Sequence, residues 1–301
     1  MDFQIEIKPT THPDILKFEA NRFLTDHESY EFANIDEAGN SPLAQQLFYL
    51  PFVKTVFIAQ NFVAIEKYDL VDWVDIQEDT AQQIYEYLNS GKPAVNNAPE
   101  TQKKIPVSVY AESTPNPAVM KFATNQKLVL KTLEFKNIDE AKNAPLAREL
   151  FNFPFVREVF LDENFVSITK YEIADWNEVT FELREFIREY LTAGKPVVDD
   201  ETFSKEKNSA EIKDEKVHQN LDETSREIVS LLDEYVKPAV AGDGGNIVFD
   251  SYNPESKSVK VILQGACSGC PSSTMTLKNG IETMLREMLD GKVESVEAVN
   301  G

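Results

Sequence analysis

The chain has 301 residues, with 30 Lys and Arg against 51 Asp and Glu, a formal net charge of -21, and 42% hydrophobic residues. The excess of acidic residues argues against sequence-independent binding of nucleic acid or of anionic membranes, because both need a basic surface. The hydrophobic fraction is sufficient for sizeable cores, and the length suits two or three domains.

The N-terminal segment MDFQIEIKPTTHPD shows no targeting signal. It lacks a basic segment followed by a continuous apolar run, and it is not an Arg-rich, acid-poor transit peptide. No stretch approaches the roughly 20 apolar residues of a membrane-spanning helix. We therefore expect a cytoplasmic protein, and in that reducing compartment the 2 cysteines are more typical of a reactive or metal-binding site than of a disulfide.

An internal repeat organises the N-terminal part of the chain. The segment PLAQQLFYLPFVKTVFIAQNFVAIEKYDLVDW, which begins at Pro42, matches PLARELFNFPFVREVFLDENFVSITKYEIADW, which begins at Pro145. Both segments continue to a Gly-Lys-Pro sequence, and the match extends upstream more weakly. The sequence thus predicts two copies of one domain, over residues 1–98 and 105–198, which is too long a period for a solenoid repeat.

Each copy is predicted to be a two-layer α/β sandwich. In the second copy, the apolar periodicity predicts a strand pair about a turn, a short helix opened by a proline, a hairpin, and a longer helix, at 119–122 with 127–133, 146–151, 158–160 with 165–171, and 178–191. Neither copy contains a cysteine, and His12 and His27 occur in the first copy only. The two copies are therefore predicted to be binding or spacer modules without catalytic residues.

A charged segment over 199–220 separates the second copy from the last domain and is typical of a tether. The last domain, 221–301, is predicted to be a small α+β domain of order α-β-β-α-β. Its first helix is expected to end before Pro238, because proline disrupts a helix interior. A glycine-rich turn, two alternating strands, a second amphipathic helix and a final strand over 293–299 follow.

The sequence predicts that Cys267 and Cys270 are the cofactor-binding and metal-ligating residues. They lie in a loop after a strand and before a helix, and the CxxC spacing lets two thiolates meet one metal or one corner of a cluster. Gly265 and Gly269 let the backbone bend around the site. The positive end of the following helix favours the thiolate form, and the neighbouring glycines and serines predict little burial.

Three kinds of site remain open on this pattern alone. A thioredoxin-like dithiol also places CxxC at a helix N-terminus. A zinc site needs four ligands, and an iron–sulfur cluster is usually held by four cysteine thiolates. Since the chain has 2 cysteines, either metal site is expected to be shared by two chains related by a two-fold axis.

The C-terminal residues resemble a known family. GDGGNIVF followed by GACSGCPSSTMTLKNGIE is similar to the C-terminal domain of the NifU-like (Nfu) iron–sulfur cluster scaffold proteins, over about 221–299. The segment ESTPNPAVMKF, 112–122, resembles the start of the Nfu N-terminal domain. The first copy has TTHPDILKF at this place and lacks the Asn-Pro-Ala core, so if this loop docks a partner, the first copy is not expected to do so.

The resemblance implies an iron–sulfur cluster assembly scaffold or carrier that is not an enzyme. It implies a labile 4Fe–4S cluster, with 2Fe–2S as the alternative, bound by Cys267 and Cys270 across a homodimer. It also implies a cluster donor, and apo iron–sulfur proteins as acceptors, without nucleic acid or membrane. The matching structural positions are Gly244, Gly245, Gly265 and Pro271. The order SGC, where many members have GSC, leaves the ligand spacing intact. The alternatives are a dithiol oxidoreductase and a zinc-bridged adaptor.

Overall fold

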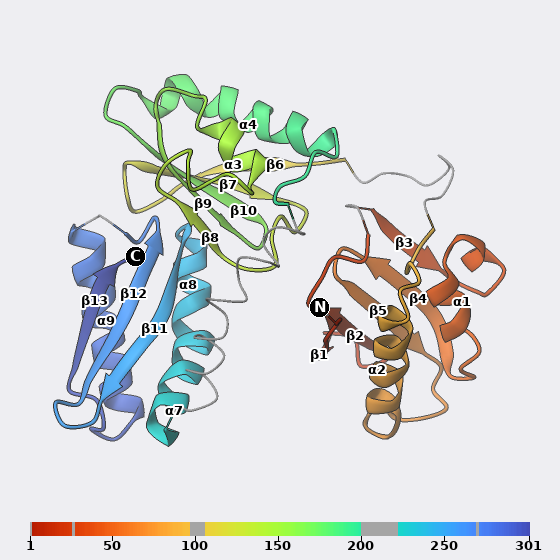
Figure 1. Ribbon diagram of the computed structural model, residues 1–301. Coiled ribbons are helices and arrows are strands. Elements are labelled where there is room, and N and C mark those ends of the chain that lie inside the picture. Colours follow the sequence, from red (N-terminus) through yellow and green to blue (C-terminus); the bar gives the residue numbers. More distant parts are fainter. Residues whose placement is uncertain (1, 26–27, 97–105, 200–221, 269–270) are drawn as a thin grey trace. The chain divides into compact units, whose positions relative to one another are not determined.

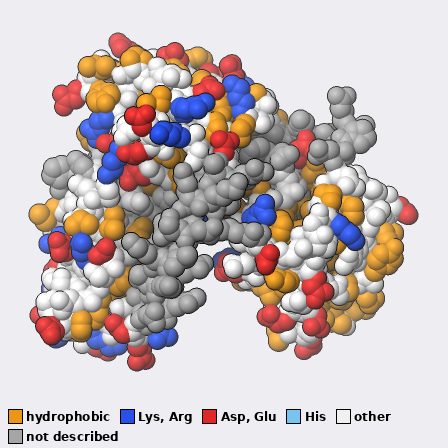
Figure 2. Space-filling view, in the orientation of Figure 1, with side chains coloured by type: hydrophobic (Ala, Val, Ile, Leu, Met, Phe, Trp, Pro, Cys, Tyr) orange, Lys and Arg blue, Asp and Glu red, His pale blue; other side chains and the backbone are white. Residues whose placement is uncertain are grey.

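A computed structural model describes residues 2–25, 28–96, 106–199, 222–268 and 271–301 (Figure 1). The chain divides into two compact units, Met1–Pro106 and Val107–Gly301. Figure 2 shows acidic and basic side chains interspersed over the visible face of each unit. In the described residues, every helix is too short or too polar to cross a membrane.

The first unit is a five-stranded antiparallel sheet with helices packed against it. The strand order is β1-β2-β5-β4-β3. A core of buried side chains, which includes Phe18, Ile65 and Ile84, joins the sheet to its longest helix. The elements are β1 (Ile5–Pro9), β2 (Ile15–Ala20), β3 (Ser29–Phe32), η1 (Glu37–Asn40), α1 (Pro42–Leu47), β4 (Val53–Ala59), β5 (Phe62–Lys67) and α2 (Trp73–Asn89).

The second repeat copy has the same architecture, with strand order β6-β7-β10-β9-β8. This confirms the predicted α/β sandwich, the hairpin, the longer helix, and the short helix opened by Pro145. A cluster of buried residues from the sheet and from both helices forms its core. The elements are β6 (Val109–Ser113), β7 (Val119–Thr124), β8 (Leu133–Phe135), α3 (Pro145–Leu150), β9 (Val156–Asp162), β10 (Phe165–Lys170) and α4 (Trp176–Thr192).

The predicted pairing of 119–122 with 127–133 is wrong. Strand β7 pairs instead with β6 and β10. The residues after β7 form a loop in which Leu128 and Val129 are buried, each 1% exposed. Their amides donate to the carbonyl of Glu163 at 2.5 and 3.2 Å. The side chains of Leu128 and Val129 therefore pack into the core of the second copy. Their backbone amides are hydrogen-bonded by the β9–β10 turn, so they need no pairing with a neighbouring strand.

The matching helices α1 and α3 differ at the residue before the proline. Ser41 is fully buried, its Oγ accepts from Ala44 N at 3.1 Å and donates to the carbonyl of Ala94 at 2.7 Å, whereas Ala144 provides no side-chain cap. We expect Ser41→Ala to lower the free energy of unfolding of the first unit by about 1–2 kcal/mol, because a helix cap and a buried hydrogen bond are lost. Urea unfolding followed by Trp73 fluorescence, in a Trp176→Phe background, measures this loss.

The exposed Gln46 on the same helix supplies the control. Gln46→Ala is expected to change the free energy of unfolding by less than about 0.5 kcal/mol, as is usual for exposed helix positions. Equal unfolding midpoints for Ser41→Ala and the parent would contradict the capping role of Ser41.

The last domain is a three-stranded sheet covered by helices. Strands β11 and β12 are antiparallel, and β12 and β13 are parallel. The order of elements confirms the predicted α-β-β-α-β domain. The elements are α7 (Glu223–Leu231), the π-helical turn η2 (Leu232–Val236), α8 (Lys237–Gly242), β11 (Gly245–Asn253), β12 (Ser258–Gly265), α9 (Pro271–Met288) and β13 (Ser295–Asn300).

The first helix of this domain does not end before Pro238, as the sequence predicted. It passes through η2 and continues as α8, in which Pro238 lies at the first helical turn. Proline lacks an N–H group and crowds the preceding helical turn, and a π-helical turn relieves both problems by changing the hydrogen-bond spacing. The helical segment therefore extends to Gly242, next to the glycine-rich turn.

Candidate metal centre

The candidate site is the loop between β12 and α9. Strand β12 ends at Gly265, which has a positive φ of 60° and turns the chain toward Cys267. Helix α9 begins at Pro271. Cys267 is described by the structure, whereas Cys270 lies outside the described residues. The convergence of the two thiols therefore stays a prediction.

Cys267 is buried, which the sequence did not predict. Its exposed fraction is 7%, and it belongs to the apolar core of the last domain, together with Ile247 and Leu263. A Cβ placed on Gly245 would lie 2.8 Å from the Cys267 Sγ, so the missing side chain makes room for the sulfur. The small neighbours therefore increase burial of the thiol, because they let the backbone of β11 lie directly against it.

Burial raises the pKa of the Cys267 thiol to about 11, and the nearby Asp243 carboxylate adds to this increase. The expectation that the N-terminus of the following helix favours the thiolate is therefore wrong for this conformation. Desolvation penalises the charged form of the buried thiol. In this conformation Cys267 is a protonated thiol at neutral pH.

This pKa predicts how alkylation of Cys267 depends on pH. In a Cys270→Ser background, we expect the iodoacetamide rate to rise about tenfold per pH unit from pH 8 to 10 and to level off only above pH 11, because the thiolate is the reactive form. Mass spectrometry of quenched samples measures the rate. The same chain unfolded in urea serves as the control and should level off near the ordinary cysteine pKa of about 8.5. A folded-state plateau below pH 9 would contradict the burial argument.

The second repeat copy contacts the candidate loop through Asn116. The Asn116 Nδ2 donates to the carbonyls of Ala266 and Ser268, at 3.2 and 3.3 Å. These carbonyls belong to the residues on either side of Cys267. Asn116 was not predicted to be a site residue, although the presence of the Asn-Pro-Ala core in only one copy was a signal.

Further polar contacts surround the same loop. The Ser167 Oγ donates to the carbonyl of Gly244 at 2.7 Å, and the Lys121 Nζ donates to the carbonyl of Gly242 at 3.1 Å. In the other direction, the amide of Gly265 donates to the Glu134 Oε1 at 3.0 Å. Burial raises the pKa of the Glu134 carboxyl, and the bond from Gly265 partly opposes this increase. The sheet of the second copy thus presents both donors and an acceptor to the last domain.

Two glycines of the last domain show how closely this domain packs against the second copy. A Cβ on Gly244 would lie 2.8 Å from the Ser167 Oγ, and a Cβ on Gly265 would lie 2.9 Å from the Phe160 Cγ. Both glycines also have positive φ, of 81° and 60°. Their lack of a side chain is therefore required by the contact with the second copy as well as by the backbone conformation.

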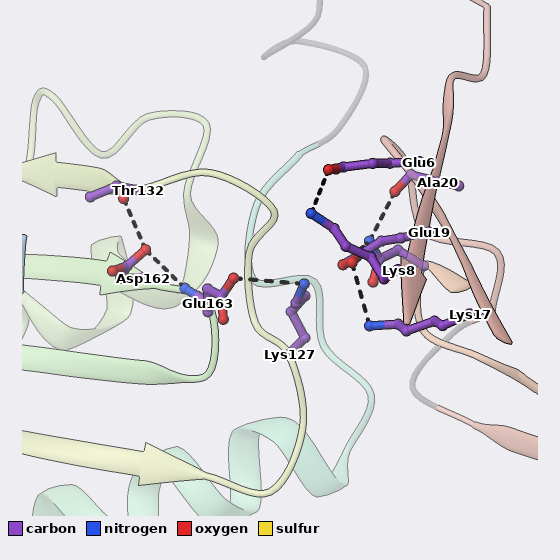
Figure 3. A network of polar contacts seen from close by, with 10 residues as sticks. Glu6, Lys8, Lys17, Glu19, Ala20, Lys127, Thr132, Asp162 and Glu163 are labelled. Carbon is purple, nitrogen blue, oxygen red and sulfur yellow. Dashed lines mark hydrogen bonds and ion pairs between the residues drawn. The ribbon is translucent and has the colours of Figure 1, made fainter. Parts of the chain in front are cut away.

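A polar network continues this contact at the turn between β9 and β10, where Figure 3 shows Thr132 and Glu163 bonded to Asp162. The Asn246 Nδ2 donates to the Thr132 Oγ1 at 3.3 Å, and this hydroxyl donates to the Asp162 Oδ1 at 2.9 Å. The amide of Glu163 donates to the same Asp162 oxygen at 3.1 Å. Burial raises the pKa of Asp162, although Thr132 holds its carboxylate by a hydrogen bond. The network links β11 of the last domain to the sheet of the second copy.

Two known protein families match most of the chain. The family described as "Scaffold protein Nfu/NifU N terminal" matches residues 5–91 and 109–194, and the "NifU-like domain" matches residues 228–297. The chain belongs to the NifU-like (Nfu) family of iron–sulfur cluster scaffold proteins. The family assignment made from the CxxC and Asn-Pro-Ala motifs is thereby confirmed, and the N-terminal domain is present twice.

Two curated Nfu relatives agree with this assignment. The chain is 32% identical to NifU-like protein 4, mitochondrial, of Arabidopsis thaliana, over 69% of this chain and 74% of the relative. It is 37% identical to the NFU1 iron-sulfur cluster scaffold homolog, mitochondrial, of Drosophila willistoni, over 64% of this chain and 63% of the relative. A solution structure of a NifU-like protein from Saccharomyces cerevisiae matches 34% of this chain and 93% of its own, with 22% identity and a TM-score of 0.30.

These Nfu relatives contradict the predicted cytoplasmic location. The curated relatives named above are both mitochondrial proteins. The prediction depended on the composition of residues 1–14, and residues 5–14 belong to the matched Nfu N-terminal domain, in which β1 forms part of the sheet.

Proposed function

We propose that two copies of this chain hold one 4Fe–4S cluster between them, each copy supplying Cys267 and Cys270, and that the cluster is passed to apo-proteins. The cluster is cargo that the protein receives and gives up. The protein is then a carrier without a catalytic residue of its own. The assignment depends above all on one observation, namely that a NifU-like domain with its CxxC in a strand-to-helix loop follows two Nfu N-terminal domains.

The chemistry of the loop suits such a cargo. Cysteine thiolates are the usual ligands of iron–sulfur clusters, and four are needed for one 4Fe–4S cluster. A chain with 2 cysteines supplies half of that number, and an isologous dimer supplies the rest. The buried position of Cys267 adds one requirement, because its thiol must turn outward and lose its proton before it can ligate iron.

The dithiol oxidoreductase is disfavoured by the buried position and the raised pKa of the Cys267 thiol. Such enzymes need an attacking thiol with a lowered pKa and access to a disulfide substrate. Cys267 has a raised pKa, of about 11, and is buried. The carrier function tolerates this state, because the incoming iron itself stabilises the thiolate.

The proposal is tested by anaerobic reconstitution of the full chain with ferrous iron and sulfide. We expect a brown dimer with about four iron and four sulfide per two chains, as one 4Fe–4S cluster requires. Mixing it with an apo 4Fe–4S dehydratase should restore dehydratase activity while the dimer loses its colour. A colourless monomer after reconstitution would contradict the proposal. A colourless dimer that a chelator dissociates and that contains zinc would replace it by the zinc-bridged adaptor.

A further inference from the structure

The two repeat copies share one loop geometry but differ in the side chains that the loop presents. In the first copy the Thr10 Oγ1 donates to the carbonyl of His12 at 3.0 Å, and in the second the Thr114 Oγ1 donates to the carbonyl of Asn116 at 2.9 Å. His12 and Asn116 therefore occupy the same place in the same turn. In strands β5 and β10, which also match, the second copy has Ser167 where the first has Ala64.

At both of these positions the residue of the second copy donates a hydrogen bond to the last domain. The Asn116 amide is fixed in orientation, because its Oδ1 accepts from the amide of Ala118 at 3.1 Å within the turn. Its Nδ2 is thereby directed at the carbonyls of Ala266 and Ser268. Ser167, which is 2% exposed, donates its hydroxyl hydrogen to Gly244. The turn thus fixes the amide so that it bonds the backbone on both sides of Cys267.

This contact restrains the backbone that carries the thiol. With the carbonyls of residues 266 and 268 bonded to one amide group, the backbone between them is pinned at two points, and Cys267 lies against Gly245 in the apolar core. A rotation of this backbone segment that carried the Cys267 thiol out of the core would strain or break the two Asn116 bonds. The contact with the second copy therefore favours the inward thiol.

We propose that the second repeat copy is a docking surface for residues 266–268 of its own chain, and that Asn116 holds this segment in the apo chain with Cys267 turned inward until cluster loading releases it. Asn116 is a positioning residue, and Ser167 supports it from the neighbouring strand. The first copy has the same fold without these donors. The release step depends on the proposed cluster function, whereas the docking and the inward thiol concern the apo chain alone.

The test uses the full apo chain with Asn116→Asp and Ser167→Ala combined, in a Cys270→Ser background. Aspartate at position 116 keeps the oxygen that accepts from the amide of Ala118 and removes the N–H donor to the loop. Alanine at position 167 is the residue that the first copy has at the matching place, Ala64. We expect iodoacetamide at pH 8 to modify Cys267 about tenfold faster, the effect of losing hydrogen bonds worth about 1.4 kcal/mol together. Hydrogen exchange of the amides of Gly265 and Ala266 should accelerate with it.

The matched control is His12→Asp, which adds the same charge at the same turn of the first copy. Its alkylation and exchange rates should stay within about twofold of the parent, as for a surface substitution. If the double variant unfolds by circular dichroism, Ser167→Ala alone is measured, with an expected increase of about threefold for one lost hydrogen bond.

Unchanged rates in a folded variant, or an equal increase in the His12→Asp control, would overturn the proposal. Both measurements are made without iron. A failure of the parent chain to bind a cluster would therefore contradict the proposed function and leave the docking surface intact, so the two failures are distinguishable.

Discussion

Replacing Cys267 by alanine is expected to abolish cluster binding by the full chain. A homodimer of Cys267→Ala offers two cysteine thiolates in total, where an iron–sulfur cluster needs about four ligands. Water or serine oxygen is a poor substitute for thiolate toward iron. After anaerobic reconstitution and desalting, we expect less than about a tenth of the parent iron and sulfide content, and no visible absorbance.

Ser268→Ala provides the control for this substitution, since it alters the side chain next to Cys267 and leaves both thiols in place. It should bind as much iron as the parent. A mixed dimer of one parent chain and one Cys267→Ala chain, purified through two different tags, should also fail to hold a stable cluster. Full iron content in the Cys267→Ala homodimer would contradict a site shared through this residue.

Replacing Ile187 by alanine is expected to destabilise the second copy by about 2–5 kcal/mol. Ile187 on α4 is fully buried against the sheet, and a truncated core side chain loses both its transfer free energy and its packing. Because this sheet carries the contacts to the CxxC loop, partial opening of the second copy should also expose Cys267. We expect faster alkylation of Cys267 at denaturant concentrations below the main unfolding transition.

Ile84 on α2 is the matched position of the first copy and is equally buried. Ile84→Ala should cost a similar 2–5 kcal/mol in the first unit, and it should leave the alkylation rate of Cys267 unchanged. Urea titrations read by Trp176 fluorescence for one variant and by Trp73 fluorescence for the other separate the two units. Equal effects of both variants on Cys267 would show that the thiol responds to global unfolding and not to the second copy.

The features predicted correctly from sequence are those fixed by neighbouring residues. Pro145 opens α3 because its missing N–H costs nothing at a helix start. The β9–β10 hairpin follows from alternating apolar residues on both sides of a short polar turn. The CxxC loop was predicted between a strand and a helix because the strand periodicity ends near Gly265 and the helical periodicity begins after Pro271. In each case the determining interactions lie within a few residues.

The errors concern features decided by distant contacts. Leu128 and Val129 have the composition of a strand, but the β9–β10 turn satisfies their amides. The edge strand β6 was missed, because its pairing with β7 determines it more than its own pattern does. Burial of Cys267 depends on Gly245, which the fold brings against it from β11. Asn116 contacts a loop about 150 residues away, a separation that no local pattern encodes.

The bonds from Asn116 to the CxxC loop join two parts of one polypeptide, which changes how strong they need to be. Tethered partners meet at an effective concentration in the millimolar range, well above the micromolar concentration of a second chain in solution. An interface too weak to detect between separated domains would therefore still be closed in the intact chain. In the proposed dimer, a second chain must then compete for the CxxC loop with the second repeat copy of the same chain. Dimer formation should depend steeply on whatever supplies the iron, and little on protein concentration alone.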